Sequence, residues 1–456
     1  MTIITSRLKN TFLSPCEQKK IIGLLDKLSD GKLVNVKGVQ LNGLRTRFTT
    51  LLSQLLEIGN PNSVSLWVRY FWESEITKAL NNEFYYPSTI ELDLTTYCNN
   101  SCFFCKEGLN KIRYDYPFQK LKKDLKEFSK IPEIKFIIYS GGGEPICYPK
   151  LAEVLAVTHQ YGFGIYLSTN GGLLGQTNLP LQVFVDNVSI LKFSLGAPTH
   201  QTYNAIHHSQ ESVMPGELNS VDYIFEQITK IIRLRNKNKR IIKVGRKSKR
   251  FPLVVIAMTV SIVNQKEIVE MAKRATASGV DELWLRPVIT SNKSLVNIKE
   301  GLRQMKKAQR LFGNKIIIKT FNHRLNFGSE KEDYFSRCVC HPVVNPDGII
   351  HQGSVTPCIF RRGNRADNYW LATGSPCQDS IVNIIESQDY ARKIKEQNVN
   401  LHSIGSKKCP RCRKTLNNIF LDILSEASLD EQNTIREIIL KLFPKTVESE
   451  MLKYLY

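Results

Sequence analysis

The spacing of hydrophobic positions changes near residue 88, and the change predicts two kinds of structure. Before this point, apolar residues recur at helical spacing in segments 21–28, 51–58 and 66–80, which predicts helices. After it, short apolar runs alternate with amphipathic stretches, which is typical of strands that alternate with helices. Residues 1–87 are therefore expected to form a helical N-terminal extension, followed by an α/β region.

Six short apolar runs after residue 88 are candidate strands, and the amphipathic segments between them are candidate helices. Strand-then-helix units in series predict a parallel sheet that closes partly into a (β/α)6 barrel of the TIM type. Right-handed crossovers place the carboxyl ends of all its strands on one face, where α/β barrels build their active sites. The expected strands are 90–94, 136–139, 165–168, 190–194, 254–260 and 282–286, and the expected helices include 119–129, 151–159, 221–234 and 265–278.

Two further regions follow the predicted barrel. The first is rich in Cys, Gly and Pro and lacks regular periodicity, which is typical of a small module held together by metal. The second returns to helical spacing. The expected organisation is a helical extension (1–87), an α/β core (88–329), a Cys-rich module (330–415) and a C-terminal helical segment (416–456).

The composition narrows the class of protein. The chain has 456 residues, of which 42% are hydrophobic and 23% charged, enough for a large core and one or two smaller units. It has no apolar run of about 18 residues, so no membrane span is expected. The N-terminus lacks the layout of a secretory signal, so a cytoplasmic location is expected. In that reducing compartment, eleven cysteines that lie mostly in two clusters indicate metal ligands rather than disulfides.

The formal net charge of +21 is concentrated in one segment, because ten Lys and Arg residues lie between positions 233 and 250. Such a run is typical of a solvated surface loop. It also fits a docking surface for a polyanion, either RNA or an acidic peptide. Aromatic residues do not interleave with these charges as they do in RNA-binding signatures, so the sequence leaves both interpretations open.

The first cysteine cluster directly follows the first predicted strand. Cys98, Cys102 and Cys105 have the spacing C-x3-C-x2-C, and Phe104 stands just before the last cysteine. Three thiolates on a short loop can bind three irons of a [4Fe–4S] cube, whose usual site has four cysteines, and the fourth iron then stays open to a ligand. A zinc site is the alternative, although structural zinc sites more often use paired C-x2-C knuckles.

This loop resembles the hallmark of the radical S-adenosylmethionine (SAM) superfamily, three cysteines and an aromatic residue after the first barrel strand. The resemblance implies that the open iron binds the amino and carboxylate groups of SAM. One electron, from a flavodoxin-like or ferredoxin-like donor, then cleaves SAM to methionine and a 5′-deoxyadenosyl radical that abstracts a substrate hydrogen. The cofactor would perform the difficult step, and the protein would orient and shield it.

Further marks of this family occur in the same order along the chain. Gly142, Gly143 and Glu144 follow the second predicted strand and look like the GGE motif, which contacts the SAM amino group. Glycine lets backbone approach a ligand closely, and Glu144 would accept hydrogen bonds from the ammonium. Such a turn alone is also typical of an ordinary βα loop, and its position after the second strand favours the SAM site.

The later strands end near residues that resemble other SAM contacts. Asn170 lies in the Thr-Asn-Gly turn after the third strand, Ser194 closes the fourth, and Arg286 lies in the sixth. Asn264 follows the fifth strand and resembles another contact. The family often has an S-x-D pattern at the fourth strand, and this chain has Gly196 in place of the aspartate.

The second cysteine cluster resembles the auxiliary-cluster extension of radical SAM enzymes, called SPASM when long and twitch when short. Cys340, Cys358, Cys409 and Cys412 would bind one auxiliary [4Fe–4S] cluster, and no cysteine follows Cys412. The resemblance therefore implies the short, twitch-like form. Zinc stays an alternative, because four cysteines can equally close a tetrahedral site.

Two cysteines of the same region, Cys338 and Cys377, are left over. Radical SAM peptide epimerases use a cysteine thiol to return a hydrogen atom to the opposite face of a carbon radical, so both are candidate hydrogen donors. Either could also replace a ligand of the auxiliary cluster. The alternative is a packed or exposed thiol without a chemical role.

The second module resembles that of enzymes that modify ribosomally made peptides, or that oxidise alcohols and protein side chains. A basic surface suits a precursor peptide with an acidic leader, and spare cysteines suit epimerisation of α-carbons. The predicted function is that of a peptide maturase or epimerase. The net charge leaves an RNA- or tRNA-modifying radical SAM enzyme as an alternative. A non-catalytic iron–sulfur protein that binds a partner through residues 1–87 is the third.

Overall fold

A computed structural model of the chain describes its helices, strands and connecting turns in two compact units. The first unit comprises residues 1–85, 327–339 and 397–451, and the second comprises 86–326, 340–396 and 452–456. Within these units the described residues are 8, 13–29, 34–36, 39–41, 43–58, 78, 84–105, 113–175, 179–207, 220–238, 240–244, 247–288, 295, 298–321, 343–345, 354–356, 373–404 and 415–442.

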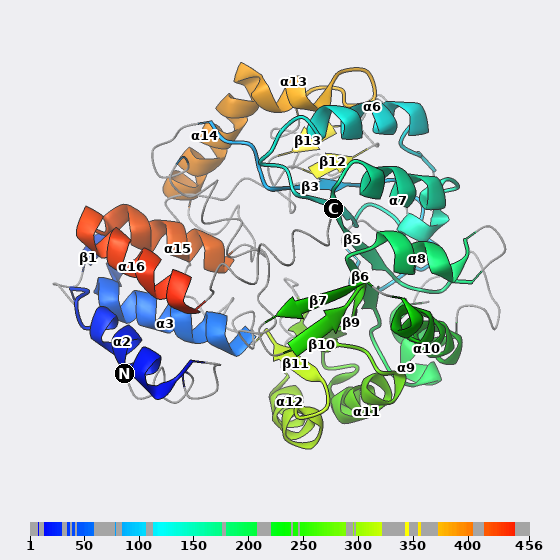
Figure 1. Ribbon diagram of the computed structural model, residues 1–456, viewed down its shortest axis with the longest axis horizontal. Coiled ribbons are helices and arrows are strands. Elements are labelled where there is room, and N and C mark those ends of the chain that lie inside the picture. The colour runs from blue at the N-terminus through cyan, green and yellow to red at the C-terminus, as the bar shows by residue number, and fades with distance from the viewer. Residues whose placement is uncertain are drawn as a thin grey trace. The chain divides into compact units, whose positions relative to one another are not determined.

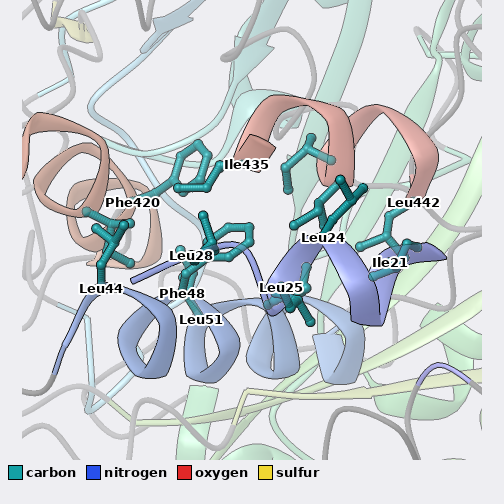
Figure 2. Packing of buried hydrophobic residues seen from close by; sticks show 14 of the residues in the cluster. Ile21, Leu24, Leu25, Leu28, Leu44, Phe48, Leu51, Phe420, Ile435 and Leu442 are labelled. Carbon is teal, nitrogen blue, oxygen red and sulfur yellow. The ribbon is translucent and has the colours of Figure 1, made fainter. Parts of the chain in front are cut away.

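The first unit brings together helices from both ends of the chain. The N-terminal helices α2 (Pro15–Leu25) and α3 (Leu44–Ile58) pack against the C-terminal helices α16 (Leu429–Leu442) and α15 (Thr415–Glu426), respectively. Figure 2 shows leucine, isoleucine and phenylalanine side chains from all four helices meeting in one cluster. Two short antiparallel strands, β1 (Val34–Val36) and β2 (Val39–Leu41), connect α2 to α3 and were not expected from the helical spacing.

Local signals define where α2 begins, and long-range contacts join the two ends of the chain. Ser14 and Glu17 form a capping box before the first turn, and Pro15 occupies the first helical position. Arg47 of α3 forms an ion pair with Glu426 of α15. The N- and C-terminal helical segments, which the sequence pattern presents as separate regions, therefore share one core, because each has an apolar face that the other covers.

The second unit is built on a nine-stranded sheet with the order β11-β10-β9-β6-β5-β4-β3-β12-β13. All neighbouring pairs are parallel except β12 and β13. The strands are β3 (Thr89–Leu92), β4 (Phe136–Tyr139), β5 (Gly164–Thr169), β6 (Ile190–Ser194), β9 (Leu253–Val260), β10 (Glu282–Pro287), β11 (Ile317–Thr320), β12 (Val343–Asn345) and β13 (Ser354–Thr356).

Helices follow the curved sheet along its outer side, as Figure 1 shows. This arrangement confirms the predicted α/β class and partial TIM-like barrel. The six predicted strands correspond to β3, β4, β5, β6, β9 and β10. The helices and helical turns are α6 (Phe118–Phe128), η3 (Pro145–Cys147), α7 (Leu151–Gln160), α8 (Leu181–Asn187), α9 (His200–His207), α10 (Val221–Lys237), η5 (Gln265–Glu267), α11 (Ile268–Ser278), α12 (Lys299–Phe312), α13 (Ile381–Glu386) and α14 (Gln388–Ile404).

The sheet extends beyond the predicted strands at both of its edges. On one side β11 pairs with β10, and on the other the hairpin of β12 and β13 begins with a parallel pairing to β3. The strands β12 and β13 have three residues each, too few for their periodicity to stand out, and β11 has four. The region expected to be a separate Cys-rich module therefore contributes two strands to the core sheet.

The basic segment 233–250 forms structure rather than a loop. It covers the end of α10 and an antiparallel hairpin of β7 (Ile241–Val244) and β8 (Lys247–Arg250). Arg235 is buried and forms an ion pair with Asp281, and the Arg240 guanidinium donates to the Val185 carbonyl (2.9 Å). Part of the basic run therefore stabilises the fold.

None of the helices in the described part of the chain combines the length and the apolar content needed to cross a membrane.

Candidate active site

The three cysteines of the first cluster lie on the loop that leaves β3. Cys98 and Cys102 are half-buried, and Cys105 is exposed. The Cys98 sulfur accepts a hydrogen bond from the Asn100 amide (3.4 Å), and the Cys105 amide donates to the Cys102 carbonyl (3.0 Å). The loop is thus tightly turned, with its last cysteine facing solvent.

Burial favours the protonated thiols in this loop. Desolvation, followed by the charge of Glu144, raises the pKa of Cys98 to about 12. Desolvation and the neighbouring Cys98 and Cys105 also raise the pKa of Cys102 well above its usual value. Metal binding at these sulfurs must therefore release protons, because the ligand form of cysteine is the thiolate.

The end of α9 holds the cysteine loop in place. The Ser101 amide donates to the His207 carbonyl (2.9 Å), and the Phe103 amide donates to the Ile206 carbonyl (3.1 Å). Carbonyls in the last turn of a helix have no partner within the helix, so the loop satisfies them. The His207 ring also reaches the loop, with Nδ1 at 3.0 Å from the Cys102 sulfur.

Glu144 joins the glycine turn after β4 to the Thr-Asn-Gly turn after β5. Its carboxylate accepts hydrogen bonds from the Thr169 hydroxyl (2.6 Å), the Asn170 amide (2.7 Å) and the Ile146 amide (3.1 Å). Burial raises its pKa from 4.5 to about 7, although these hydrogen bonds act in the opposite direction. A carboxylate can accept about four hydrogen bonds, so among the contacts of the described residues one acceptor position is left for a cationic ligand.

The backbone of the protein itself requires glycine at position 143. A Cβ atom there would lie 2.2 Å from the Tyr97 carbonyl oxygen and 2.8 Å from that of Thr95. The turn therefore packs against the segment that leads from β3 into Cys98. Gly142 has more room, since its Cβ would lie 3.2 Å from the nearest atom, Oδ2 of Asp93. The sequence pattern predicted that glycine is needed here for the close approach of a ligand. At Gly143 the group that approaches closely is the backbone of Thr95 and Tyr97.

Asn170 connects the Thr-Asn-Gly turn to the cysteine loop. Its Nδ2 donates to Oδ1 of Asn99 (2.7 Å) and lies 3.9 Å from the Cys98 sulfur, while its Oδ1 accepts from the Gly172 amide (2.9 Å). Asn99 is 1% exposed, and its Nδ2 has no hydrogen-bond partner among the described residues. A buried donor of this kind suits an anionic ligand at the loop.

The residues at the later strands differ in what they can contact. Ser194 is half-buried at the end of β6. Arg286 is half-buried in β10, and its guanidinium lies over the rings of Trp284 (4.3 Å) and Phe321 (5.1 Å). Asn264 is fully buried, and its Nδ2 donates to the carbonyls of Gly196 (2.6 Å) and Thr259 (2.8 Å). Asn264 therefore supports the turn after β6 from within the fold.

The donor set of the loop fits an iron–sulfur cluster. Among the described residues, no three His, Cys, Asp or Glu side chains converge closely enough to ligate one metal ion. A cube does not require that convergence, because each thiolate binds a different iron. Three cysteines on one turn and the buried Asn99 donor match three iron ligands and an adjacent acceptor atom.

The predicted auxiliary ligands lie outside the described residues. These are Cys340, Cys358, Cys409 and Cys412, together with Cys338, one of the two candidate hydrogen donors. The other candidate, Cys377, is half-buried, and burial raises the pKa of its thiol. The charged groups that act on it are Lys120 and Asp124, so this thiol lies beside α6.

Comparison with known proteins agrees with this geometry. The sequence profile of the radical SAM superfamily matches residues 92–275, which run from β3 through most of α11. The chain carries a radical SAM domain. A radical SAM domain is characteristic of enzymes that use SAM and a [4Fe–4S] cluster as cofactors.

Two curated relatives are similar to the chain in sequence. The tungsten-containing aldehyde ferredoxin oxidoreductase cofactor-modifying protein of Pyrococcus furiosus is 25% identical over 318 residues, 66% of this chain and 81% of its own. The S-adenosyl-L-methionine-dependent tRNA 4-demethylwyosine synthase of Pyrococcus abyssi is 30% identical over 93 residues, 19% of this chain and 25% of its own.

Among solved structures, Streptococcus suis SuiB bound to S-adenosylmethionine has a TM-score of 0.50 at 13% identity and covers 75% of each chain. SuiB bound to its precursor peptide SuiA has the same TM-score and identity, and covers 91% of this chain and 85% of its own. At this identity the likeness supports the fold of the chain.

Several residues of the candidate site were not predicted from the sequence. His207 and Asn99 contact the cluster cysteines or their neighbours, and Thr169 binds Glu144. Cys147 lies near the loop, with its sulfur 3.9 Å from Oδ1 of Asn99. Thr169 could have been found as part of the Thr-Asn-Gly motif. The sequence contains no signal for His207, which is distant from the cysteines along the chain.

Proposed function

We propose that Cys98, Cys102 and Cys105 bind three irons of a [4Fe–4S] cluster and that Glu144 and Asn170 form the adjacent SAM site. The observation that carries the proposal is the hydrogen-bond connection from Glu144 through Asn170 and Asn99 to the cysteine loop. It brings the glycine turn, the Thr-Asn-Gly turn and the cysteines to one place at the ends of β3, β4 and β5.

The chemistry of this site is divided between cofactors and protein. When reduced by an external one-electron donor of the flavodoxin or ferredoxin type, the cluster and SAM supply a 5′-deoxyadenosyl radical that abstracts a substrate hydrogen. Glu144 accepts hydrogen bonds from the SAM ammonium, and the Asn99 amide donates to an anionic group at the loop. Gly142, Ser194 and Arg286 extend the SAM site along the edge of the sheet. Burial of Asn99, Asn100 and Ser101 limits water access to the first part of the loop.

The cluster assignment is tested with Cys98→Ala and a matched cysteine control. Cys16 is exposed on α2 in the helical unit, so Cys16→Ala removes a thiol without touching the loop. After anaerobic reconstitution, the parent and Cys16→Ala are expected to cleave SAM to 5′-deoxyadenosine with dithionite, and Cys98→Ala is expected to lose this activity and the corresponding iron. Equal iron content and equal cleavage in all three proteins would contradict the proposal.

We further propose an auxiliary [4Fe–4S] cluster on Cys340, Cys358, Cys409 and Cys412. Support comes from their number and spacing, and from the β12–β13 hairpin between the first two. Replacing Cys409 and Cys412 by alanine should remove one cluster's iron and leave SAM cleavage intact. Zinc content that falls with the same substitutions would establish the zinc alternative. Cys338 and Cys377 remain proposed hydrogen donors.

For the substrate we propose a ribosomally synthesised precursor peptide, modified by epimerisation or by another change at its backbone or side chains. SuiB, which has a similar fold, is known in complex with a precursor peptide, and the net charge of +21 suits an acidic leader.

The peptide proposal is tested first by searching the neighbouring genes for a small open reading frame that encodes a precursor peptide. That peptide is then incubated with the protein, SAM and a reductant in heavy water. Epimerisation should add about one deuterium per inverted centre, because the returned hydrogen comes from an exchangeable thiol. A precursor that keeps its mass and stereochemistry, in an assay that still forms 5′-deoxyadenosine, would refute a peptide substrate. Turnover of a small cofactor precursor instead would agree with the named role of the Pyrococcus furiosus relative.

A second candidate is tRNA modification, favoured by the local similarity to the tRNA 4-demethylwyosine synthase and by the basic β7–β8 hairpin. Neutralising Lys243, Lys247 and Lys249 should then weaken tRNA binding and lower its salt dependence. Arg235 and Arg240 must be kept, because their side chains bond protein atoms. Salt-independent binding by the parent, or unchanged binding by the triple variant, would count against this candidate.

A further inference from the structure

One residue outside the family-like motifs contacts a cluster cysteine. His207, the last residue of α9, is 2% exposed, and its Nδ1 lies 3.0 Å from the Cys102 sulfur. Its Nε2 accepts a hydrogen bond from the Gly196 amide (2.8 Å). Because an amide N–H can only donate, Nε2 must be the unprotonated acceptor. In the neutral ring the proton is then on Nδ1, from which it is donated to the Cys102 sulfur.

The surroundings of His207 hold the ring in this orientation. Tyr203 lies against one side with ring centroids 4.5 Å apart, and Phe104 of the cysteine loop meets it edge-on at 6.1 Å. Asn264 fixes the Gly196 peptide through the hydrogen bond to its carbonyl (2.6 Å). Asn264 thus holds residue 196, the Gly196 amide binds the His207 ring, and the ring contacts the sulfur of Cys102.

Glycine at position 196 makes this contact possible. A Cβ atom there would lie 2.8 Å from Nε2 of His207 and 2.7 Å from Cγ2 of Ile206. The position at which the chain departs from the S-x-D pattern is therefore the one that gives His207 room to approach. Any larger residue at 196 would displace the imidazole or the end of α9.

We propose that His207 is a positioning residue that donates its Nδ1 hydrogen to the Cys102 thiolate and thereby raises the reduction potential of the SAM-binding cluster. The inference rests on the proposed binding of that cluster by Cys98, Cys102 and Cys105. A reduced cluster carries one more negative charge than an oxidised one, and part of that charge lies on the ligand sulfurs. A hydrogen bond to a sulfur therefore stabilises the reduced form more.

The test measures the midpoint potential of the reconstituted full-length protein without any substrate. The EPR signal of the reduced cluster is followed in an anaerobic redox titration, and the signal that changes on addition of SAM identifies the cluster in question. His207→Phe removes both ring nitrogens and is expected to shift the midpoint to a more negative value. His207→Asn keeps an N–H donor near the position of Nδ1, so its midpoint should lie between those of His207→Phe and the parent. His200→Phe, on the exposed start of the same helix, should keep the parental midpoint.

The possible results separate failure of this inference from failure of the proposed function. A parental midpoint in His207→Phe with full iron and sulfide content would overturn the inference. If His207→Phe fails to hold the cluster, Gly196→Ala displaces the ring without removing it, and a parental midpoint in that variant would overturn the inference equally. If the parent itself binds no SAM-sensitive cluster, it is the proposed function that fails.

Discussion

At the scale of single residues, the site is dominated by polar groups that the fold buries and then satisfies. Glu144 is 4% exposed, yet its carboxylate accepts three hydrogen bonds from the turns around it. Asn170 similarly uses both ends of its amide within the protein. The candidate SAM contacts therefore serve first as connections between turns, so their substitution should affect both ligand binding and local stability.

The pKa of Glu144 gives a prediction about stability and pH. Because burial raises this pKa from 4.5 to about 7, the folded protein binds more protons than the unfolded chain between these values, and stability falls as the pH rises through them. The loss amounts to roughly 3 kcal/mol. Glu144→Gln removes the titrating group and should therefore not show this loss. Measured without SAM, the thermal midpoint of the variant should rise relative to that of the parent between about pH 5 and about pH 8.

The decisive measurement is how the difference in thermal midpoint between the parent and Glu144→Gln changes with pH. A constant offset is expected as well, because one atom of the glutamine amide becomes a donor that faces the Asn170 or Thr169 donors. Glu153→Gln, at an exposed position of α7, serves as the control and should leave the pH dependence unchanged. Parallel curves for the parent and Glu144→Gln would show that burial of this carboxylate has no energetic effect.

At the scale of elements, the loops after β3, β4 and β5 form one assembly. The glycine turn packs on the exit of β3, Glu144 binds the turn after β5, and α9 holds the cysteine loop. The loop geometry needed for three iron ligands is thus set by neighbouring elements, each of which ends at the same edge of the sheet.

Gly143→Ala tests this dependence. The added Cβ would meet the Tyr97 carbonyl at 2.2 Å, a contact that forces the backbone before Cys98 to move. We expect a destabilisation of about 1–3 kcal/mol and a large loss of bound iron, measured by unfolding and by iron analysis. Gly23→Ala is the matched control, because its Cβ would have no neighbour within 4 Å. In helix α2 it should stabilise by about 0.5–1 kcal/mol. Normal iron content in Gly143→Ala would contradict the packing argument.

At the scale of the whole molecule, the chain divides into a helical unit and an α/β unit, each with its own core. The helical unit is assembled from both ends of the chain, so its N-terminal helices depend on its C-terminal ones. Phe48 of α3 is fully buried and lies 6.4 Å, between ring centroids, from Phe420 of α15. Figure 2 shows both side chains within the shared cluster.

Phe48→Ala should therefore destabilise both ends of the chain together. The lost burial and the cavity are expected to cost about 3–5 kcal/mol. Hydrogen exchange measured by mass spectrometry should report faster exchange in α2, α3, α15 and α16, with the strands of the α/β unit unchanged. Thr50→Ala, at an exposed position of the same helix, should leave exchange at the parental level. Faster exchange confined to α3 would show that the two ends are energetically independent.

Features that depend on neighbouring residues could be predicted from the sequence, and features that depend on contacts between distant residues could not. The alternation of strands and helices and the order of the cysteine, glycine and Thr-Asn-Gly turns are local patterns, and they identified the α/β barrel and most of the candidate site. The strands β12 and β13 were missed because three-residue segments carry little periodicity, and β11, which is as long as β3 and β4, was missed as well. The pairing of the N- and C-terminal helices was missed because an apolar face does not say which segment covers it.

By itself, then, the sequence determined the class of fold and singled out the three cysteines as candidate ligands, because strand periodicity and ligand spacing are local patterns of neighbouring residues. The tertiary structure alone decided that Gly143 is required by the Tyr97 backbone, that Glu144 links two turns, and that His207 meets Cys102. These contacts join residues far apart in the chain at the carboxyl edge of one sheet. Their existence depends on how closely the loops approach after folding, which no local pattern specifies.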